Sequence, residues 1–493
     1  MHSPGSSPVA RDLWLLMGLG LVLFTAGLGL REPWPADEPL HALIARDMLA
    51  TGNWLVPMVG GDLFQDKPPL LFWLQAASYT FTGERIGFLL PSLLAALGTL
   101  LLVYDLGRRL WNREAGLAAA LLLLFTVQFT LQARRAQFDA LLVFFTTLSA
   151  YCLFRQLLLG GGWRWSIGAG LAAGLGVLTK FVGFFSYLLL LPWFFAWWRS
   201  WPGVRWQQPV IFWAGSFAAC FAVVAAWLLP VWLAARQDPA MAAYLHELVV
   251  THTVGRYVEP WHHHKPAWYY LQVIATLWLP LALLIPWLVP RWKQALAARD
   301  ARVLMPLAFV VLYVGFFSVS GGKRDIYILS ALPMLALAAA PFTGELLRRA
   351  GAQHALAALA LLIGAVCTAA ALWLGFVDKG AGAKLLAGSG VRGFAPALVL
   401  GLIALLLMAT LRLRRAHLAL AGTLAAGWLI AGWWVFPQMD ADRSARGFIR
   451  RVEAMADPAR ELGLLAYHEH FLWQLRRPTV NFGHRRFREG DAE

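Results

Sequence analysis

Long apolar stretches, separated by short polar loops, recur from one end of the chain to the other. Each stretch is about 17–25 residues long, which lets a helix cross a hydrocarbon core of ~30 Å. The pattern predicts an all-α polytopic membrane protein with about thirteen transmembrane helices. The predicted helices are 12–30, 86–107, 115–131, 138–158, 165–180, 182–198, 209–232, 268–289, 303–319, 325–341, 354–376, 394–411 and 417–436.

The first long polar interruption, residues 31–85, has apolar patterns of its own. Apolar residues follow helical spacing over 41–49, and a second apolar stretch over 70–81 is too short to span a membrane comfortably. Both segments are predicted as helices that lie at the membrane interface.

The segment after the last predicted span is much more highly charged than the rest of the chain. Short runs at 463–467 and 479–482 predict two strands, with a helix over 469–475 between them. We therefore expect a transmembrane domain over 1–436 and a small C-terminal α/β appendage over 437–493.

Composition agrees with a membrane protein. Hydrophobic residues make up 59% of the chain and charged residues only 14%, whereas a soluble domain has about 25% charged residues. The 25 tryptophans fit as well, because Trp gathers at membrane–water interfaces. The net charge of +15 is explained by basic loops and a basic tail, so nucleic acid is not an expected partner.

The distribution of Lys and Arg predicts the orientation of the chain. One alternate set of short loops is basic, and these loops are expected in the cytoplasm: 108–113, 199–205, 291–302, 348–349 and 412–415. The long loops 31–85 and 233–267 hold ten of the 27 acids and six of the twelve histidines and are expected outside. The N-terminus is then cytoplasmic and the C-terminus external.

Carboxylates at two external positions are candidates for chemistry. Asp37-Glu38 follows the first span, and Asp139 follows Arg135 at the start of another. A carboxylate held outside beside the membrane can bind or deprotonate an acceptor. The alternative is structural, since acids near a helix N-terminus are stabilised by the helix dipole.

Cations surround the same external surface. Lys67 lies in Asp66-Lys67-Pro68-Pro69, where the prolines stiffen the backbone beside the ammonium. Lys180 ends a predicted span, and Lys323-Arg324 forms a basic turn outside, against the charge trend. Such groups suit a phosphate at the head-group level, and the alternative for the two single lysines is snorkelling to the interface.

A divalent cation is a further possibility in the histidine-rich second external loop. Its candidate ligands are Asp66, His262, His263 and His264. Histidines of a polar interface loop without a metal are the alternative, and no cofactor is assigned with certainty. Taken together, the external cations, carboxylates and aromatic residues predict a phosphorylated lipid that enters sideways from the bilayer.

These motifs resemble the GT-C class of membrane glycosyltransferases, specifically the lipid A aminoarabinose transferases and their protein O-mannosyltransferase-like relatives. The resemblance covers essentially the whole chain. The matching motifs include Asp37-Glu38, Ile44-Ala45-Arg46-Asp47-Met48, Asp66-Lys67-Pro68-Pro69-Leu70, Arg135 with Asp139, Leu178-Thr179-Lys180, His264-Lys265-Pro266 with Tyr270, and Lys323 with Tyr327.

The resemblance implies transfer of a sugar from an undecaprenyl-phosphate carrier to an acceptor on the periplasmic side of a bacterial inner membrane, with a lipid A phosphate of lipopolysaccharide as acceptor. It also implies residue roles. These are catalytic Asp37, Glu38 and Asp139; donor-phosphate-binding Lys67, Lys180, Lys323, Arg324 and Tyr327; and substrate-binding Asp66, Arg135, His264 and Tyr270.

Departures from the family pattern leave the sugar and the acceptor open. Pro39-Leu40-His41 stands where the family has Arg-Tyr, and Asp66 replaces a Glu. A protein O-glycosyltransferase on the same scaffold is one alternative. A lipid or solute transporter is another, although the external concentration of charge and the lack of an internal repeat disfavour it.

Overall fold

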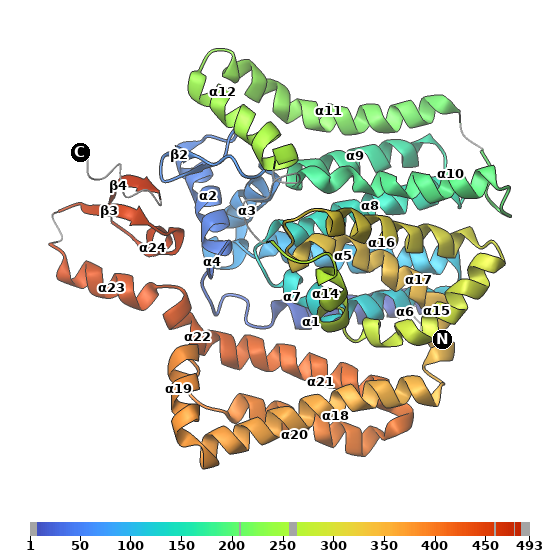
Figure 1. Ribbon diagram of the computed structural model, residues 1–493. Helices are drawn as coiled ribbons and strands as arrows, with labels where there is room; N and C mark the ends of the chain where they lie inside the picture. Colours follow the sequence, from blue (N-terminus) through green and yellow to red (C-terminus); the bar gives the residue numbers. More distant parts are fainter. Residues whose placement is uncertain (1–6, 207–208, 256–263, 458–459, 478, 485–493) are drawn as a thin grey trace, which may run out of the picture.

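The computed structural model describes residues 7–206, 209–255, 264–457, 460–477 and 479–484. Most of the chain is a body of helices that run roughly side by side, and a small strand-containing unit stands at one end (Figure 1). The all-α membrane fold with a small α/β appendage is confirmed.

Apolar helices in the described part of the chain compare closely with the predicted spans. Nine helical segments are long and apolar enough to cross a membrane, or up to eleven if each bent pair counts as one span. The bent pairs fall on predicted spans 115–131 and 268–289, and the 17-residue helices α9 and α20 fall on 165–180 and 394–411. Every predicted span therefore falls on helix, but the count of thirteen is not confirmed.

Two helix pairs are bent, and the second bend has a local cause. The helices α6 (Arg113–Leu124) and α7 (Val127–Ala133) meet at 71°, and α14 (Tyr269–Leu277) and α15 (Leu281–Ala297) meet at 108°. Pro280 directly precedes α15 and has no N–H to continue the hydrogen bonds of α14. An apolar stretch can thus be long enough to span without forming one straight helix.

The N-terminal half supplies the central helices and the 31–85 loop. Helix α2 (Glu38–Thr51) ends at Gly52, whose backbone N–H donates to the carbonyl of Met48. The φ of 70° at this position suits a residue without a Cβ. The remaining elements of this half are α1 (Pro8–Thr25), α2 (Glu38–Thr51), β1 (Met58–Val59), β2 (Asp62–Leu63), α3 (Leu70–Thr82), α4 (Glu84–Gly87), α5 (Leu90–Leu110), α8 (Phe138–Leu157), α9 (Trp163–Thr179), η1 (Phe181–Leu189), α10 (Leu190–Trp198), α11 (Val210–Ala235), α12 (Pro239–His246) and η2 (Glu247–Gly255).

The C-terminal half adds a second group of helices and the terminal unit. The helices α18, α20 and α21 pack against one another along one side of the body (Figure 1). The elements are α16 (Ala301–Val319), η3 (Asp325–Ala331), α17 (Leu332–Leu346), α18 (Ala350–Leu372), η4 (Trp373–Val377), α19 (Lys379–Ser389), α20 (Ala395–Leu411), η5 (Leu413–Arg415), α21 (Ala416–Ile430), η6 (Ala431–Val435), α22 (Phe436–Arg443), α23 (Arg446–Met455), β3 (Leu462–Tyr467), α24 (Glu469–Gln474) and β4 (Thr479–His484).

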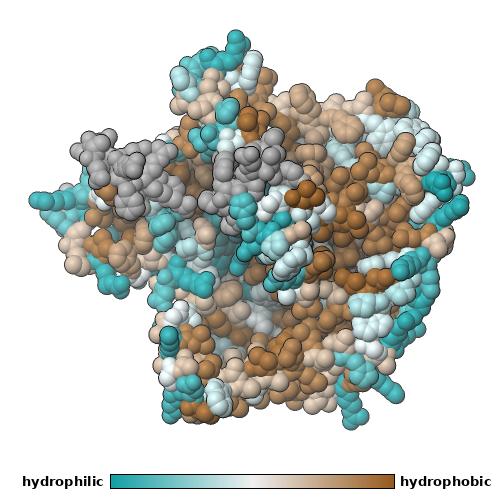
Figure 2. Space-filling model, viewed as in Figure 1, coloured by the Kyte–Doolittle hydropathy of each residue, from teal (hydrophilic) through white to brown (hydrophobic). Residues whose placement is uncertain are grey.

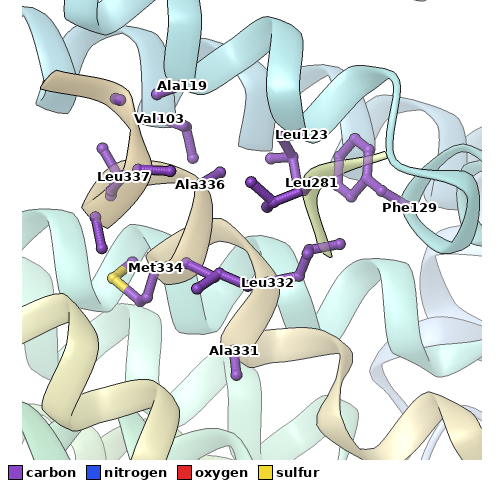
Figure 3. Packing of buried hydrophobic residues seen from close by; sticks show 14 of the residues in the cluster. Val103, Ala119, Leu123, Phe129, Leu281, Ala331, Leu332, Met334, Ala336 and Leu337 are labelled. Carbon is purple, nitrogen blue, oxygen red and sulfur yellow. The ribbon is translucent and has the colours of Figure 1, made fainter. Parts of the chain in front are cut away.

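The core of the body is built around α17. Its alanines and leucines pack against α5 and α6, as Figure 3 shows for Ala336 and Leu337 beside Val103 and Ala119. Small side chains allow helix backbones to approach closely, which is how helices associate within a bilayer. By contrast, α11 exposes large apolar side chains, including Phe221, and apolar surface is extensive on the face in Figure 2.

The two helices predicted in the 31–85 loop are present as α2 and α3. They pack on each other, and Ala42, Ile44 and Phe72 between them are fully buried. The loop is therefore a folded cap over the helix ends. Its position at a membrane interface stays a prediction.

The predicted strand–helix–strand tail is also present. β3 and β4 pair in parallel, with Leu462 opposite Thr479, and α24 connects them. Arg46 on α2 donates hydrogen bonds to the carbonyls of Leu472 and Trp473 at 3.3 and 3.1 Å. The tail is thus fastened to the same cap that carries the candidate carboxylates.

Candidate active site

Asp37 lies in the 31–85 loop and directly precedes α2. In the described structure its side chain makes no capping hydrogen bond to that helix. Its Oδ2 instead accepts hydrogen bonds from Arg324 Nη2 and from Gln137 Nε2, both at 3.0 Å. The side chain of Asp37 therefore faces groups from distant parts of the chain, and a helix cap is not what it provides.

The charge of Asp37 is stabilised although the group is partly buried. Burial raises the pKa of this carboxyl, but the positive charges of Arg324 and Lys67 and the hydrogen bond from Arg324 outweigh it and leave the pKa below its usual range. The side chain remains 29% exposed. Asp37 is thus an ionised, accessible carboxylate at neutral pH.

Arg324 joins two of the predicted carboxylates electrostatically. It directly precedes the 3₁₀ helix η3. Burial lowers the pKa of its guanidinium, but Asp37 and Asp139 together raise it above its ordinary value. The turn at 323–324 thus places the positive charge of Arg324 near Asp37, which precedes α2, and near Asp139 on α8.

Lys67 lies next to this group. Its Nζ donates to the carbonyl of Asp66 at 2.9 Å and lies 3.1 Å from Asp66 Oδ2. Pro68 and Pro69 follow, and α3 begins at Leu70. The ammonium is therefore held beside Asp66, next to a short segment that two prolines stiffen.

Lys180, Asp139 and Tyr327 form a second group. The Nζ of Lys180 lies 3.2 Å from Asp139 Oδ1 and 4.6 Å from the centre of the Tyr327 ring. Lys180 ends α9, Asp139 is in the first turn of α8, and Tyr327 is on η3. Three separate elements thus bring together a residue that the sequence proposes as catalytic, Asp139, and two that it proposes for binding the donor phosphate, Lys180 and Tyr327.

Glu38 has quite different surroundings from its neighbour Asp37. Both carboxylate oxygens bind the Arg31 guanidinium, at 2.5 and 2.8 Å. The backbone amides of Trp34 and Ala136 donate to the same carboxylate, each at 3.0 Å. Glu38 is 4% exposed, and its hydrogen bonds connect the start of the 31–85 loop to the segment before α8. Its predicted catalytic role stays a prediction.

Among the described residues, the other predicted substrate and phosphate residues form no hydrogen bond or ion pair with Asp37. Lys323 is buried, and its Nζ donates to the backbone carbonyls of Ser320 and Lys265. His264 is exposed and pairs through its backbone with Gly322. Arg135 is exposed, whereas Tyr270 is buried in α14.

The structure offers no support for a metal site within the part of the chain that it describes, where no group of three or more His, Cys, Asp or Glu could hold an ion. Of the candidate ligands, His262 and His263 lie outside the described residues. The divalent cation at Asp66 and His262–His264 therefore stays an untested expectation.

Three residues near the site were not singled out by the sequence. Gln137 contacts Asp37, and Arg31 holds Glu38. His41 is buried one turn after Asp37, and its Nδ1 lies 2.8 Å from the carbonyl oxygen of Ala136. Burial lowers the pKa of His41, which leaves it neutral at physiological pH. The only signal was position in the sequence: Gln137 lies two residues before Asp139, His41 four residues after Asp37, and Arg31 six residues before Asp37.

Comparison with known proteins identifies the scaffold. The pattern of the family described as "Dolichyl-phosphate-mannose-protein mannosyltransferase" matches residues 66–229. An undecaprenyl phosphate-alpha-4-amino-4-deoxy-L-arabinose arabinosyl transferase of Sodalis glossinidius is 31% identical over 71% of this chain and 63% of its own length. One from Pseudomonas aeruginosa is 32% identical over 66% of this chain and 58% of its own length. The chain belongs to the GT-C family of membrane glycosyltransferases.

Solved structures of other proteins have a fold similar to that of this chain. The crystal structure of ArnT from Cupriavidus metallidurans bound to undecaprenyl phosphate superimposes with a TM-score of 0.77 at 19% identity, covering 98% of this chain and 88% of that one. An oligosaccharyltransferase of Archaeoglobus fulgidus gives a TM-score of 0.53 at 12% identity, covering 95% and 64%. The chain covers less than two thirds of the length of the two arabinosyl transferases named above.

Proposed function

We propose that this GT-C protein transfers a sugar from an undecaprenyl-phosphate carrier to a lipid A phosphate at the periplasmic face of the bacterial inner membrane. The observation that carries the proposal is the ionised Asp37 with Arg324 and Lys67 beside it. The relatives named for an undecaprenyl-phosphate-linked aminoarabinose add the donor class.

The reaction breaks one bond and forms one. An oxygen of the acceptor phosphate attacks the anomeric carbon of the sugar, and the bond from that carbon to the carrier phosphate breaks. The electron pair leaves with undecaprenyl phosphate, whose new negative charge needs positive neighbours. Lys67, Lys180 and Arg324 are the accessible cations of this site, since none of their side chains is fully buried.

The state of Asp37 favours a phosphate acceptor over a hydroxyl. A carboxylate whose pKa lies below its ordinary value is a weak base, and a hydroxyl acceptor needs a base. A phosphate oxygen is already ionised and needs none. Asp37 then orients the sugar or the acceptor through charge and hydrogen bonding.

A protein acceptor is the second candidate, because the family pattern that matches residues 66–229 is that of protein mannosyltransferases. With a hydroxyl as acceptor, Asp37 would be the base. The two candidates place the same carriers and cations at the same site and differ only in the product.

The orientation of the chain follows from the same proposal. The cap formed by 31–85 and the C-terminal unit face the periplasm, and the N-terminus is cytoplasmic. A reporter that is active only in the periplasm should work when fused after residue 493 and stay silent when inserted near residue 297. The reverse pattern would remove the periplasmic placement of every site residue.

The deciding experiment is mass spectrometry of lipid A and of periplasmic proteins from cells with and without the protein. Proteoliposomes that contain undecaprenyl-phosphate aminoarabinose and lipid A provide the purified counterpart. Lipid A that carries the sugar only when the protein is present supports the proposal. Sugar on proteins and none on lipid A would establish the protein acceptor, and no transfer to either would reject both.

A further inference from the structure

Gln137 is the residue immediately before α8, and its side chain turns away from that helix. It makes no capping bond to α8 in the described structure, and its Nε2 donates to Asp37 Oδ2 at 3.0 Å. A carboxylate that carries its charge has no hydrogen to give, so the partner atom of Gln137 must be the amide nitrogen. This bond therefore fixes the amide orientation: nitrogen toward Asp37 and oxygen away.

The amide oxygen of Gln137 lowers the stability of the folded protein. It is buried and, among the described residues, accepts no hydrogen bond. A buried acceptor without a partner opposes folding, whereas an apolar side chain of similar shape would not. The stability of the fold therefore gives no reason for glutamine at this position, and its contact with Asp37 does.

The contact restricts Asp37 in a particular way. Arg324 and Gln137 come from η3 and α8, two separate elements, yet both bind the same oxygen, Oδ2. No described residue hydrogen-bonds the other oxygen, Oδ1. Two donors from different directions hinder rotation of the carboxylate and leave Oδ1 as the oxygen that can meet a substrate.

The start of α8 also carries the second carboxylate. Asp139, two residues after Gln137, pairs with Lys180 at 3.2 Å. The segment is itself fastened, because the amide of Ala136 donates to Glu38 and its carbonyl oxygen lies 2.8 Å from His41 Nδ1. The orientation of Asp37 is thus tied to the element that places the Lys180–Asp139 pair.

We propose that Gln137 is a positioning residue, which holds the Asp37 carboxylate so that Oδ1 faces the sugar or the acceptor. The inference rests on the proposed function, because it assigns Asp37 a part in transfer. It adds a residue that acts through Asp37 and touches no substrate itself.

The test replaces Gln137 by Met, which is similar in length but donates no hydrogen bond. Gln156→Met is the matched control, since Gln156 is another buried glutamine of α8 whose amide atoms have no hydrogen-bond partner in the described part of the chain. We expect Gln137→Met to lower kcat about tenfold, the scale of one hydrogen bond to a charged group. The KM for the donor and the thermal stability should stay near those of the wild type.

A pH profile separates positioning from general damage. The charged groups around Asp37 are Arg324, Lys67 and the titratable His41, and all three remain in the variant. The hydrogen bond from Gln137 favours the ionised carboxylate, so its loss raises the pKa of Asp37. The acid limb of the kcat profile should therefore move to higher pH in Gln137→Met and stay in place in Gln156→Met.

The outcomes are distinct. Wild-type turnover with unchanged kcat and unchanged pH profile in Gln137→Met would overturn the inference and leave the proposed function intact. Equal losses in both glutamine variants, together with lower melting temperatures, would assign Gln137 a packing role and also overturn it. A wild-type protein that transfers no sugar would reject the proposed function itself.

Discussion

Asp12 and Asp37 are both paired with an arginine from a distant part of the sequence, but the two carboxylates are used differently. Asp12 binds Arg113 through both oxygens, at 2.6 and 2.7 Å, and also accepts from Tyr104 at 2.9 Å. Its side chain is 4% exposed. Asp37 uses one oxygen and is 29% exposed. A buried carboxylate with both oxygens bound fastens helices together, whereas a partly exposed one that is bound through a single oxygen can still bind a ligand.

The same difference separates Asp37 from Glu38, its neighbour in the chain. Glu38 receives four hydrogen bonds, two from Arg31 and two from backbone amides. These bonds join the end of the first loop to the start of α8. We infer that the two neighbouring acids have different roles: Glu38 stabilises the fold, and Asp37 contacts the substrate.

The largest effect is expected for Lys67→Ala. Lys67 is the cation that the stiff Asp66–Pro69 segment holds beside Asp37, and removal of one such electrostatic contact costs about 100- to 1000-fold in turnover. The measurement is transfer in proteoliposomes, with Lys379→Ala, an exposed lysine of α19, as the control. Full transfer by Lys67→Ala would exclude Lys67 from phosphate binding.

A loss of about 100-fold in kcat is expected for Asp37→Asn, the scale of one positioned acid–base or charged group. Donor binding should be largely spared, because the cations bind the phosphate. Asp12→Asn is the matched change at the filled carboxylate. It should lower the melting temperature while each folded molecule keeps its turnover.

The proposed difference between Asp37 and Asp12 would be wrong if Asp37→Asn and Asp12→Asn had the same effects on turnover and melting temperature. Loss of donor binding with normal kcat in Asp37→Asn would move Asp37 to sugar recognition. If neither parameter changed, Asp139 would become the leading carboxylate.

Glu38→Gln should act first on stability. The substitution leaves the Arg31 guanidinium buried beside a neutral group, and removal of one partner of a buried ion pair costs about 3–5 kcal/mol in the free energy of unfolding. Thermal unfolding in detergent measures this. A variant that is as stable as the wild type but has lost turnover would instead assign Glu38 a direct part in catalysis, as the sequence predicts.

The sequence predicts the helices and the chemistry of the site better than it predicts the contacts. Every predicted span falls on helix because hydropathy reports burial in lipid, but hydropathy does not report the bends at α6–α7 and α14–α15. The polar motifs around Asp37, Lys67 and Lys180 are visible because charged groups are rare in an apolar chain.

Which cation binds which carboxylate could not be read from the sequence. Lys323 and Arg324 are adjacent and both positively charged, yet Lys323 donates to backbone carbonyls and Arg324 to Asp37, 287 residues away in the chain. Such choices depend on the packing of η3 against α8. Gln137 is invisible for the same reason, because a neutral side chain beside a helix start has no pattern of its own.

The smallest effect concerns the fastening of the tail to the cap. Arg46 donates to the carbonyls of Leu472 and Trp473 and stacks over the Trp473 ring at 4.8 Å from its centre. Arg46→Met keeps most of the apolar stem but removes the donors and the charge. Loss of hydrogen bonds from a charged group, about 1.5 kcal/mol, should raise the population of the detached tail about tenfold.

Limited chymotrypsin digestion of the purified protein measures that population, because cleavage in the tail requires it to open. Arg476→Met, at an exposed arginine of the same tail, controls for the loss of charge. Trp473 also donates from Nε1 to Glu32 Oε2 at 3.1 Å, so the tail keeps a second fastening and should not detach completely. Faster digestion with kcat near that of the wild type would show that the tail is held independently of the Asp37 carboxylate. A matching fall in kcat would instead mean that the docked tail helps to shape the site.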